Sequence, residues 1–128
     1  MSRLRGAYCG PVDDDRVRPS LLAGFWSFLA GGLVLVAVIV ALDPITRREE
    51  CPNYGAAGNA SAFADPVWDL YLPLMAIAWI SFVAVEQTLP VTRRHRSRAA
   101  WAARAAAALV LAVVGSCCLV VPLGIVCH

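Results

Sequence analysis

Cysteine is the residue type in this chain with the most varied chemistry. The 128-residue sequence has five cysteines, Cys9, Cys51, Cys117, Cys118 and Cys127. Two thiols can form a structural disulfide, exchange reversibly as a redox pair, or bind a soft metal ion as thiolates. The compartment of each cysteine decides among these roles, so the elements that carry them must be placed first.

The last cysteines suggest a metal site, because Cys117, Cys118, Cys127 and His128 all carry metal-binding side chains. Adjacent residues on a helix, however, point about 100° apart, so Cys117 and Cys118 cannot both face one ion. Cysteine is also among the commonest small buried residues. We therefore interpret this pair as packing residues and expect neither a metal nor another cofactor.

Two carboxylates, Asp69 and Glu86, lie near the ends of an otherwise apolar segment. We expect Glu86 to pair with Arg93 or Arg94. For Asp69 we consider two roles. Either its negative charge stabilises the first turn of a helix through the helix dipole, or its side chain makes a polar contact with the outer loop or a partner. The middle of each apolar segment has no charge, which argues against an ion or proton pathway.

Catalytic signatures are absent from the sequence, which contains no H-E-x-x-H, G-x-S-x-G or P-loop pattern. A cluster of arginines between positions 93 and 104 could suggest a nucleic-acid site. Membrane topology explains this cluster without a nucleic acid. The sequence therefore predicts a protein that is not an enzyme and has no nucleic-acid partner.

The composition is that of a membrane protein. Hydrophobic residues make up 59% of the chain and charged residues only 16%, with a mean hydropathy of +0.66. A soluble chain of this length has too little interior to hide so much apolar surface. The basic residues are all arginine, and with the alanine-rich runs this composition is typical of a GC-rich bacterial genome.

The apolar runs predict an all-α membrane protein with three transmembrane helices in a single domain, residues 1–128. Each run is long enough to cross a hydrocarbon core of about 30 Å. The predicted segments are a cytoplasmic tail (1–19), a first span (20–42), an outer loop of roughly 20 residues (43–65), a second span (66–89), a basic cytoplasmic loop (90–103) and a third span (104–127). An alternative start of the third helix is near Arg98, with Trp101 as an anchor at the inner membrane interface.

The distribution of arginine predicts the orientation. Nine of the eleven arginines fall in the tail and around the second loop, and two fall in the first loop. Because basic loops stay in the cytoplasm, we expect the N-terminus inside and the C-terminus outside a bacterial inner (plasma) membrane. The residues expected to fix this topology and to contact lipid headgroups are Arg93, Arg94, Arg96, Arg98 and Arg104.

This topology puts Cys51 and Cys127 together in the oxidising compartment, and no other cysteine with them. We therefore predict a disulfide between them, with two free thiols as the alternative. A loop this long would give the bridge about 4–5 kcal/mol of stabilisation in the chain-entropy account.

Small residues recur at helical spacing on two of the predicted spans. They are Ala23, Ser27 and Gly31 on the first span, and Ala108, Ala112 and Ser116 on the third. Because small residues allow close helix approach in lipid, we expect these spans to pack in parallel through both stripes. Alternatively, one stripe is the docking face for a partner.

We expect a non-enzymatic accessory, assembly or interaction subunit, whose partners are the lipid bilayer and another membrane protein or a second copy of itself. One alternative is a homo-oligomeric channel or small transporter. The other is a thiol-redox membrane protein that uses Cys51 and Cys127 as a working pair.

Overall fold

The computed structural model describes residues 22, 24–56, 58–93 and 96–128. Of these residues, 71% are helical and none lies in a strand, so the all-α class predicted from the sequence is confirmed. The helices, in chain order, are α1 (Trp26–Leu42), the short 3-10 helix η1 (Arg48–Glu50), α2 (Trp68–Thr88), α3 (Pro90–Arg93) and α4 (Arg98–Ile125).

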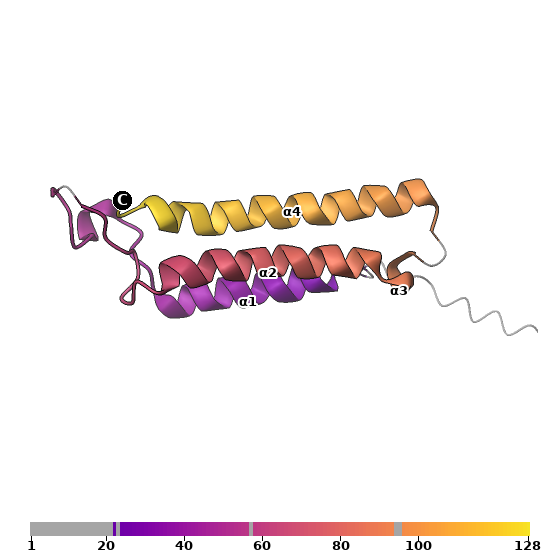
Figure 1. The fold of residues 1–128 in the computed structure, drawn as a ribbon, viewed down its shortest axis with the longest axis horizontal. Helices are drawn as coiled ribbons and strands as arrows, with labels where there is room; N and C mark the ends of the chain where they lie inside the picture. Colours follow the sequence, from indigo (N-terminus) through magenta and orange to yellow (C-terminus); the bar gives the residue numbers. More distant parts are fainter. Residues whose placement is uncertain (1–21, 23, 57, 94–95) are drawn as a thin grey trace, which may run out of the picture.

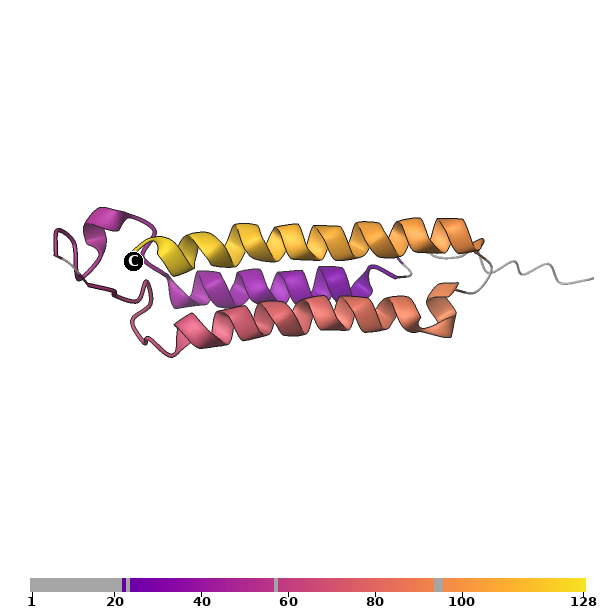
Figure 2. The ribbon, with the colours of Figure 1, turned by 45° about the horizontal axis from the view of Figure 1, so that its top comes forward.

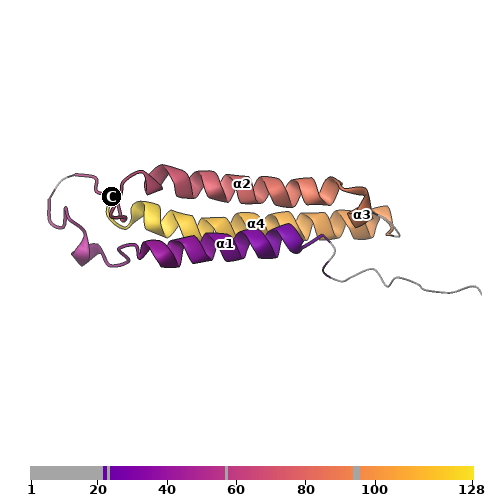
Figure 3. The same cartoon turned by 90° about the horizontal axis from the view of Figure 1, so that it is seen from below.

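The three long helices lie side by side in an elongated bundle (Figures 1 and 2). Helices α1 and α4 run in the same direction, and α2 runs opposite to both. The connection from α1 to α2 and the C-terminus meet at one end, while α3 lies at the other end (Figure 3). We call these the disulfide end (residues 43–69 and 122–128) and the arginine end (residues 24–28 and 86–104).

The helix boundaries differ from the prediction mainly at the arginine end. The first helix ends at Leu42 as predicted, but it begins at Trp26, and residues 20, 21 and 23 lie outside the described part of the chain. Helix α4 begins at Arg98, the earlier of its two predicted starts, because the Ser97 hydroxyl caps it, accepting a hydrogen bond from the Ala100 N–H at 3.2 Å. The predicted loop 90–103 also contains α3, which starts at a proline.

Two helices of the described chain, α2 and α4, are long and apolar enough to cross a membrane. They have 21 and 28 residues, or about 31 and 42 Å of helix. Helix α1 has no charged residue, but it has only 17 residues, or about 25 Å. Its described part therefore falls short of the length predicted for the first span.

The centre of the bundle is filled by side chains from all three long helices. Leu35, Leu72, Val83, Ala108 and Ala112 are each almost completely buried. Contacts of α2 with α1 and with α4 are more extensive than those between α1 and α4. Helix α2 is thus the element on which the other two pack.

Candidate functional site

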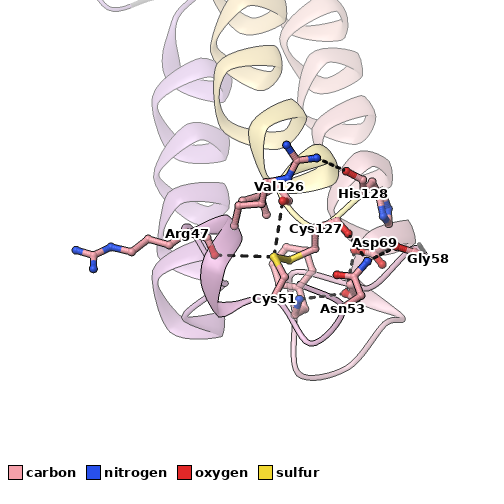
Figure 4. The surroundings of a disulfide bond; sticks show 11 residues. Arg47, Cys51, Asn53, Gly58, Asp69, Val126, Cys127 and His128 are labelled. Carbon is pink, nitrogen blue, oxygen red and sulfur yellow. Dashed lines mark hydrogen bonds between the residues drawn. A yellow bond between two sulfur atoms is a disulfide. The ribbon is translucent and has the colours of Figure 1, made fainter. Parts of the chain in front are cut away.

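The disulfide end is closed by the bond between Cys51 and Cys127, the pair expected from the sequence. Their sulfurs lie 2.07 Å apart, and the two residues are separated by 76 positions in the chain (Figure 4). Cys51 is only 6% exposed and Cys127 only 5%. A thiolate must approach a disulfide sulfur to exchange with it, so this burial favours a structural role over a redox role.

Hydrogen bonds reinforce the bridge by joining the loop to the C-terminal residues (Figure 4). The Asn53 side-chain amide donates to the carbonyl of Cys127 at 3.1 Å and also to the carbonyl of Gly58. The Ala60 N–H donates to the same Cys127 carbonyl, and the Arg48 guanidinium donates to the His128 carbonyl at 3.2 Å. The end of α4 is therefore held by main-chain contacts as well as by the covalent bond.

Asp69 makes the loop contact that was one of its two predicted roles. Its carboxylate accepts a hydrogen bond from the Ser61 hydroxyl at 3.1 Å, and that hydroxyl accepts one from the Phe63 N–H at 3.0 Å. Phe63 is 6% exposed and belongs to the core. Asp69 thus ties the loop to the first turn of α2.

Trp79 of α2 occupies the middle of the bundle, between glycines of the other two helices. A Cβ at Gly31 would overlap Cδ1 of Trp79, and Cβ atoms at Gly32 and Gly115 would lie 3.1 and 3.4 Å from its ring. The Trp79 indole N–H donates to the Phe28 carbonyl at 3.1 Å. The glycines therefore make room for one large side chain, whose polar atom is also satisfied.

Among the small residues of the two predicted stripes, Gly31 lies against a residue of α2, which was not expected. Ala108, Ala112 and Ser116 are buried, but Gly31 contacts Trp79 of α2. Ser27 is half-buried, and Ala23 lies outside the described residues. Trp79 was not predicted as a packing residue from the sequence. Its indole N–H, a polar group in an apolar helix that needs a hydrogen-bond partner, could have indicated it.

Glu86 has a partner on α1 that was not predicted. Its two carboxylate oxygens accept hydrogen bonds from the N–H groups of Trp26 and Ser27, at 3.2 and 2.8 Å. Because these N–H groups open α1, a side chain of α2 caps the N-terminus of α1. Arg93 instead lies over the Trp101 ring at 4.5 Å, and Arg94 lies outside the described residues.

Three further residues with polar side-chain atoms complete the arginine end, and two of them, Gln87 and Thr92, were not predicted from the sequence. Buried Gln87 donates to the Gly24 carbonyl at 2.6 Å, and the Trp101 indole N–H donates to the Gln87 carbonyl at 3.0 Å. Buried Thr92 donates to the Glu86 carbonyl at 2.9 Å. Gly24 has a φ of +95°, and a Cβ there would lie 2.9 Å from the Thr92 methyl group, so this position requires glycine.

The remaining predicted residues fall into two groups. Arg96 and Arg98 lie beside Arg93 at the arginine end, and the Arg104 guanidinium lies 5.0 Å from the centre of the Phe25 ring. Cys117 and Cys118 are exposed on α4 and are free thiols. Their interpretation as buried packing residues was wrong, because α4 turns this face away from the bundle.

Asp69 and Glu86 make structural contacts in the described part of the chain. Within the described part of the chain, no group of three or more His, Cys, Asp and Glu side chains is placed to hold a metal ion. Comparisons with protein-family models, with curated proteins and with solved structures found no match for this chain.

Proposed function

We propose that this chain is a three-span integral membrane protein that acts as a non-enzymatic accessory or assembly subunit of a larger membrane complex. The proposed site is the cell's inner (plasma) membrane, with the arginine end in the cytoplasm and the disulfide end outside.

The observation that carries the membrane proposal is the exposure of apolar helices. In the apolar 18-residue stretch of each helix, only 22% of α2 and 17% of α4 are buried inside the bundle. A core helix of a soluble protein would be mostly buried, whereas here Leu70, Ile77, Phe82 and Ile125 are each about three-fifths exposed. Surface of this extent needs an apolar surrounding, and lipid supplies it.

The positions of the charges support the same proposal. On α2, no charge lies between Asp69 and Glu86, which are about 26 Å apart along the helix axis. Helix α1 is uncharged throughout, and its start is capped by Glu86 at the same depth. We therefore extend the proposal to α1 as a third span, with a short hydrophobic length that the bilayer accommodates by local thinning.

The orientation rests on the basic residues. Arg93, Arg96, Arg98 and Arg104 lie at one end of the described bundle, and Arg47 and Arg48 at the other. The first end thus has more arginines than the second, and an excess of basic residues favours a cytoplasmic position. A buried disulfide at the opposite end suits an oxidising compartment.

The choice of an interaction role follows from how the polar side chains are used. Three of the groups that could do chemistry serve the fold: Cys51 is bonded, Glu86 caps α1 and Asp69 holds the loop. The bundle axis is filled by Leu35, Trp79 and Val83. The outward helix faces remain available, and in a bundle of three helices they make up most of the surface.

Native mass spectrometry of the chain, gently extracted from its source membrane without reductant, tests the proposal. A stable complex with a different membrane protein supports the accessory role. A defined homo-oligomer without another protein contradicts it and favours the channel alternative, which liposome flux would then measure. The same spectrum shows whether Cys51 and Cys127 are bonded, because an intact disulfide makes the chain two hydrogens lighter.

A further inference from the structure

The two bonded cysteines reach the disulfide end at different stages of the chain. Cys51 follows α1, whereas Cys127 follows α4, so that α2 and α4 both lie between them in the sequence. Because a chain is made and inserted from its N-terminus, Cys51 is outside the membrane in the proposed topology before either later span exists. It therefore waits there as a free thiol until Cys127 arrives.

We propose that Cys51 is the residue through which this bond is made, by exchange with a protein disulfide oxidant outside the membrane. The Cys51 thiolate attacks the disulfide of the oxidant, which forms a mixed disulfide and releases one oxidant sulfur as a thiolate. The Cys127 thiolate then attacks Sγ of Cys51, forms the observed bond and releases the second oxidant sulfur. The two thiols of the chain are thus oxidised, the oxidant is reduced to a dithiol, and the two thiol protons pass to it through water.

The tethers that join the two cysteines to their helices differ in length. Cys51 lies nine residues after Leu42, the end of α1, and an open chain of that length spans up to about 30 Å. Cys127 lies two residues after Ile125, the end of α4, which allows only about 7 Å. Before the bond forms, Cys51 can therefore move much farther from its helix than Cys127 can.

The membrane surface obstructs a large reagent at Cys127. Ile125 is 63% exposed, so the apolar surface that α4 presents to lipid continues to its last residue. A small protein domain is about 30 Å across, and the bilayer restricts its approach to a thiol held this close to the end of a span. The same domain can meet an extended Cys51 in water, which makes Cys51 the point of entry and Cys127 the resolving thiol.

Closure of the loop follows the exchange. In the folded chain, Cys51 and Cys127 are only 6% and 5% exposed. The Asn53 amide donates to the Cys127 carbonyl at 3.1 Å, and the Arg48 guanidinium donates to the His128 carbonyl (Figure 4). A protein attached to Cys51 would occupy the space of these contacts, so they form after Cys127 has displaced it. The buried bond is then protected from further exchange, in agreement with its structural role.

The order of exchange is tested by comparing a small and a large disulfide on full chains with one thiol each. Cys127→Ser keeps Cys51, and Cys51→Ser keeps Cys127, both with Cys9, Cys117 and Cys118 changed to serine. The chains are placed in lipid nanodiscs, which leave both faces of the bilayer accessible. The small probe is dithiobis(nitrobenzoate), and the large probe is a small soluble protein whose single cysteine is activated as its thionitrobenzoate disulfide. Absorbance of the released thionitrobenzoate gives the rate of attack.

We expect both thiols to react with the small probe at similar rates. The protein probe should react about tenfold faster with Cys51, because exchange depends on access to the attacking thiol. Ala64→Cys, in a chain without the five native cysteines, is the matched control: this position is exposed in the same loop and should react with both probes. Equal rates of the protein probe with the two native thiols, a faster rate at Cys127, or no reaction at Cys51 would overturn the proposal.

A second measurement does not depend on the stability of the single-thiol chains. The chain that keeps both Cys51 and Cys127 is reduced, exposed to the protein probe and quenched with acid before the exchange is complete. Peptide mass mapping then locates the protein adduct, which we expect on Cys51. An adduct mainly on Cys127 would contradict the order of steps.

This inference rests on the proposed membrane insertion, and carbonate washing of proteoliposomes separates the two. A chain released into the supernatant overturns the proposed function and this inference with it. If the chain stays in the washed membrane but the protein probe does not prefer Cys51, the order of exchange is wrong and the proposed function stands.

Discussion

The two ends of the bundle hold the same three helices together by different chemistry. At the disulfide end, a covalent bond joins residues 76 positions apart and is supported by hydrogen bonds from the Asn53 side chain and the Ala60 N–H to the Cys127 carbonyl. At the arginine end, side chains of α2 hold the other helices without a covalent bond: Glu86 and Gln87 capture the start of α1, and the Gln87 carbonyl accepts from Trp101 of α4.

For α4, the difference follows the sequence distance to the segment that holds each of its ends. Between α2 and α4 only nine residues intervene, so their contact needs little loop closure. The disulfide end must bring the long first loop to the last residues of the chain, which costs more entropy in closing. A covalent bond holds the distant contact of α4 and a hydrogen bond holds its close one, whereas the start of α1 is held by hydrogen bonds from residues about 60 positions away.

The largest effect is expected from breaking the disulfide end. Cys51→Ser/Cys127→Ser should lower the free energy of unfolding by about 4–5 kcal/mol, because the unfolded chain gains the freedom that the bridge removes. Thermal unfolding in detergent, followed by circular dichroism, measures the loss. The matched variant Cys117→Ser/Cys118→Ser changes two free, exposed thiols and should unfold as the unaltered chain does. Equal stability of both variants would show that the bridge contributes little.

Packing in the middle of the bundle depends on the close fit between Trp79 and the glycines around it, and a substitution at Gly31 tests this fit. Gly31→Ala places a methyl group into the Trp79 ring and should destabilise the fold by about 2–3 kcal/mol. Gly124→Ala is the matched control: it lies on α4 with nothing within 4 Å of the added Cβ, and it should be neutral or slightly stabilising. Similar melting temperatures for the two variants would refute the close fit around Trp79.

At the arginine end, Glu86→Ala removes the cap of α1 and should destabilise the fold by about 1–2 kcal/mol. Glu86→Gln keeps an acceptor oxygen and should lose less. Glu49→Ala removes the same charge from an exposed position of η1 and should change the stability by under about 0.5 kcal/mol. If Glu49→Ala matched Glu86→Ala in chemical denaturation, the capping role would be wrong.

The smallest effect should come from Trp101→Phe. This change removes the hydrogen bond to the Gln87 carbonyl but keeps a ring for Arg93, so we expect a loss of about 1 kcal/mol. Hydrogen exchange at the start of α4 should rise before exchange elsewhere. A uniform rise across all three helices would show that the contact supports the whole bundle rather than this end.

The positions of the long helices and the disulfide pairing could be predicted from the sequence, because the pattern of apolar and charged residues determines them. The apolar runs located the three long helices, and the arginine distribution led to the pairing of Cys51 with Cys127. The end of the first helix at Leu42 was also correct, because Asp43 and Pro44 stop it there. These features depend on the order of apolar, charged and helix-breaking residues along the chain, which the sequence contains directly.

The sequence could not predict which way each helix faces. A helix that is apolar all round carries no polar face to mark its exposed side, so neither the contact of Gly31 with Trp79 nor the exposure of Cys117 and Cys118 was foreseen. The partner of Glu86 was missed for a related reason. Proximity in sequence favoured Arg93 and Arg94, whereas the fold brings the start of α1 to Glu86 from about 60 residues away.

The central claim is that the bundle crosses a membrane with its arginine end inside and its disulfide end outside. Ala64→Cys and Ala99→Cys each place one thiol at an exposed alanine, at the disulfide end and the arginine end respectively. Both are made in a chain with Cys9, Cys117 and Cys118 changed to serine, which leaves the Cys51–Cys127 bridge in place.

A membrane-impermeant maleimide, added to intact cells, then reports the side of each thiol. The account predicts that Ala64→Cys is labelled in intact cells and Ala99→Cys only after the membrane is opened. The reverse pattern would contradict the orientation, and labelling of both thiols in intact cells would contradict the crossing itself.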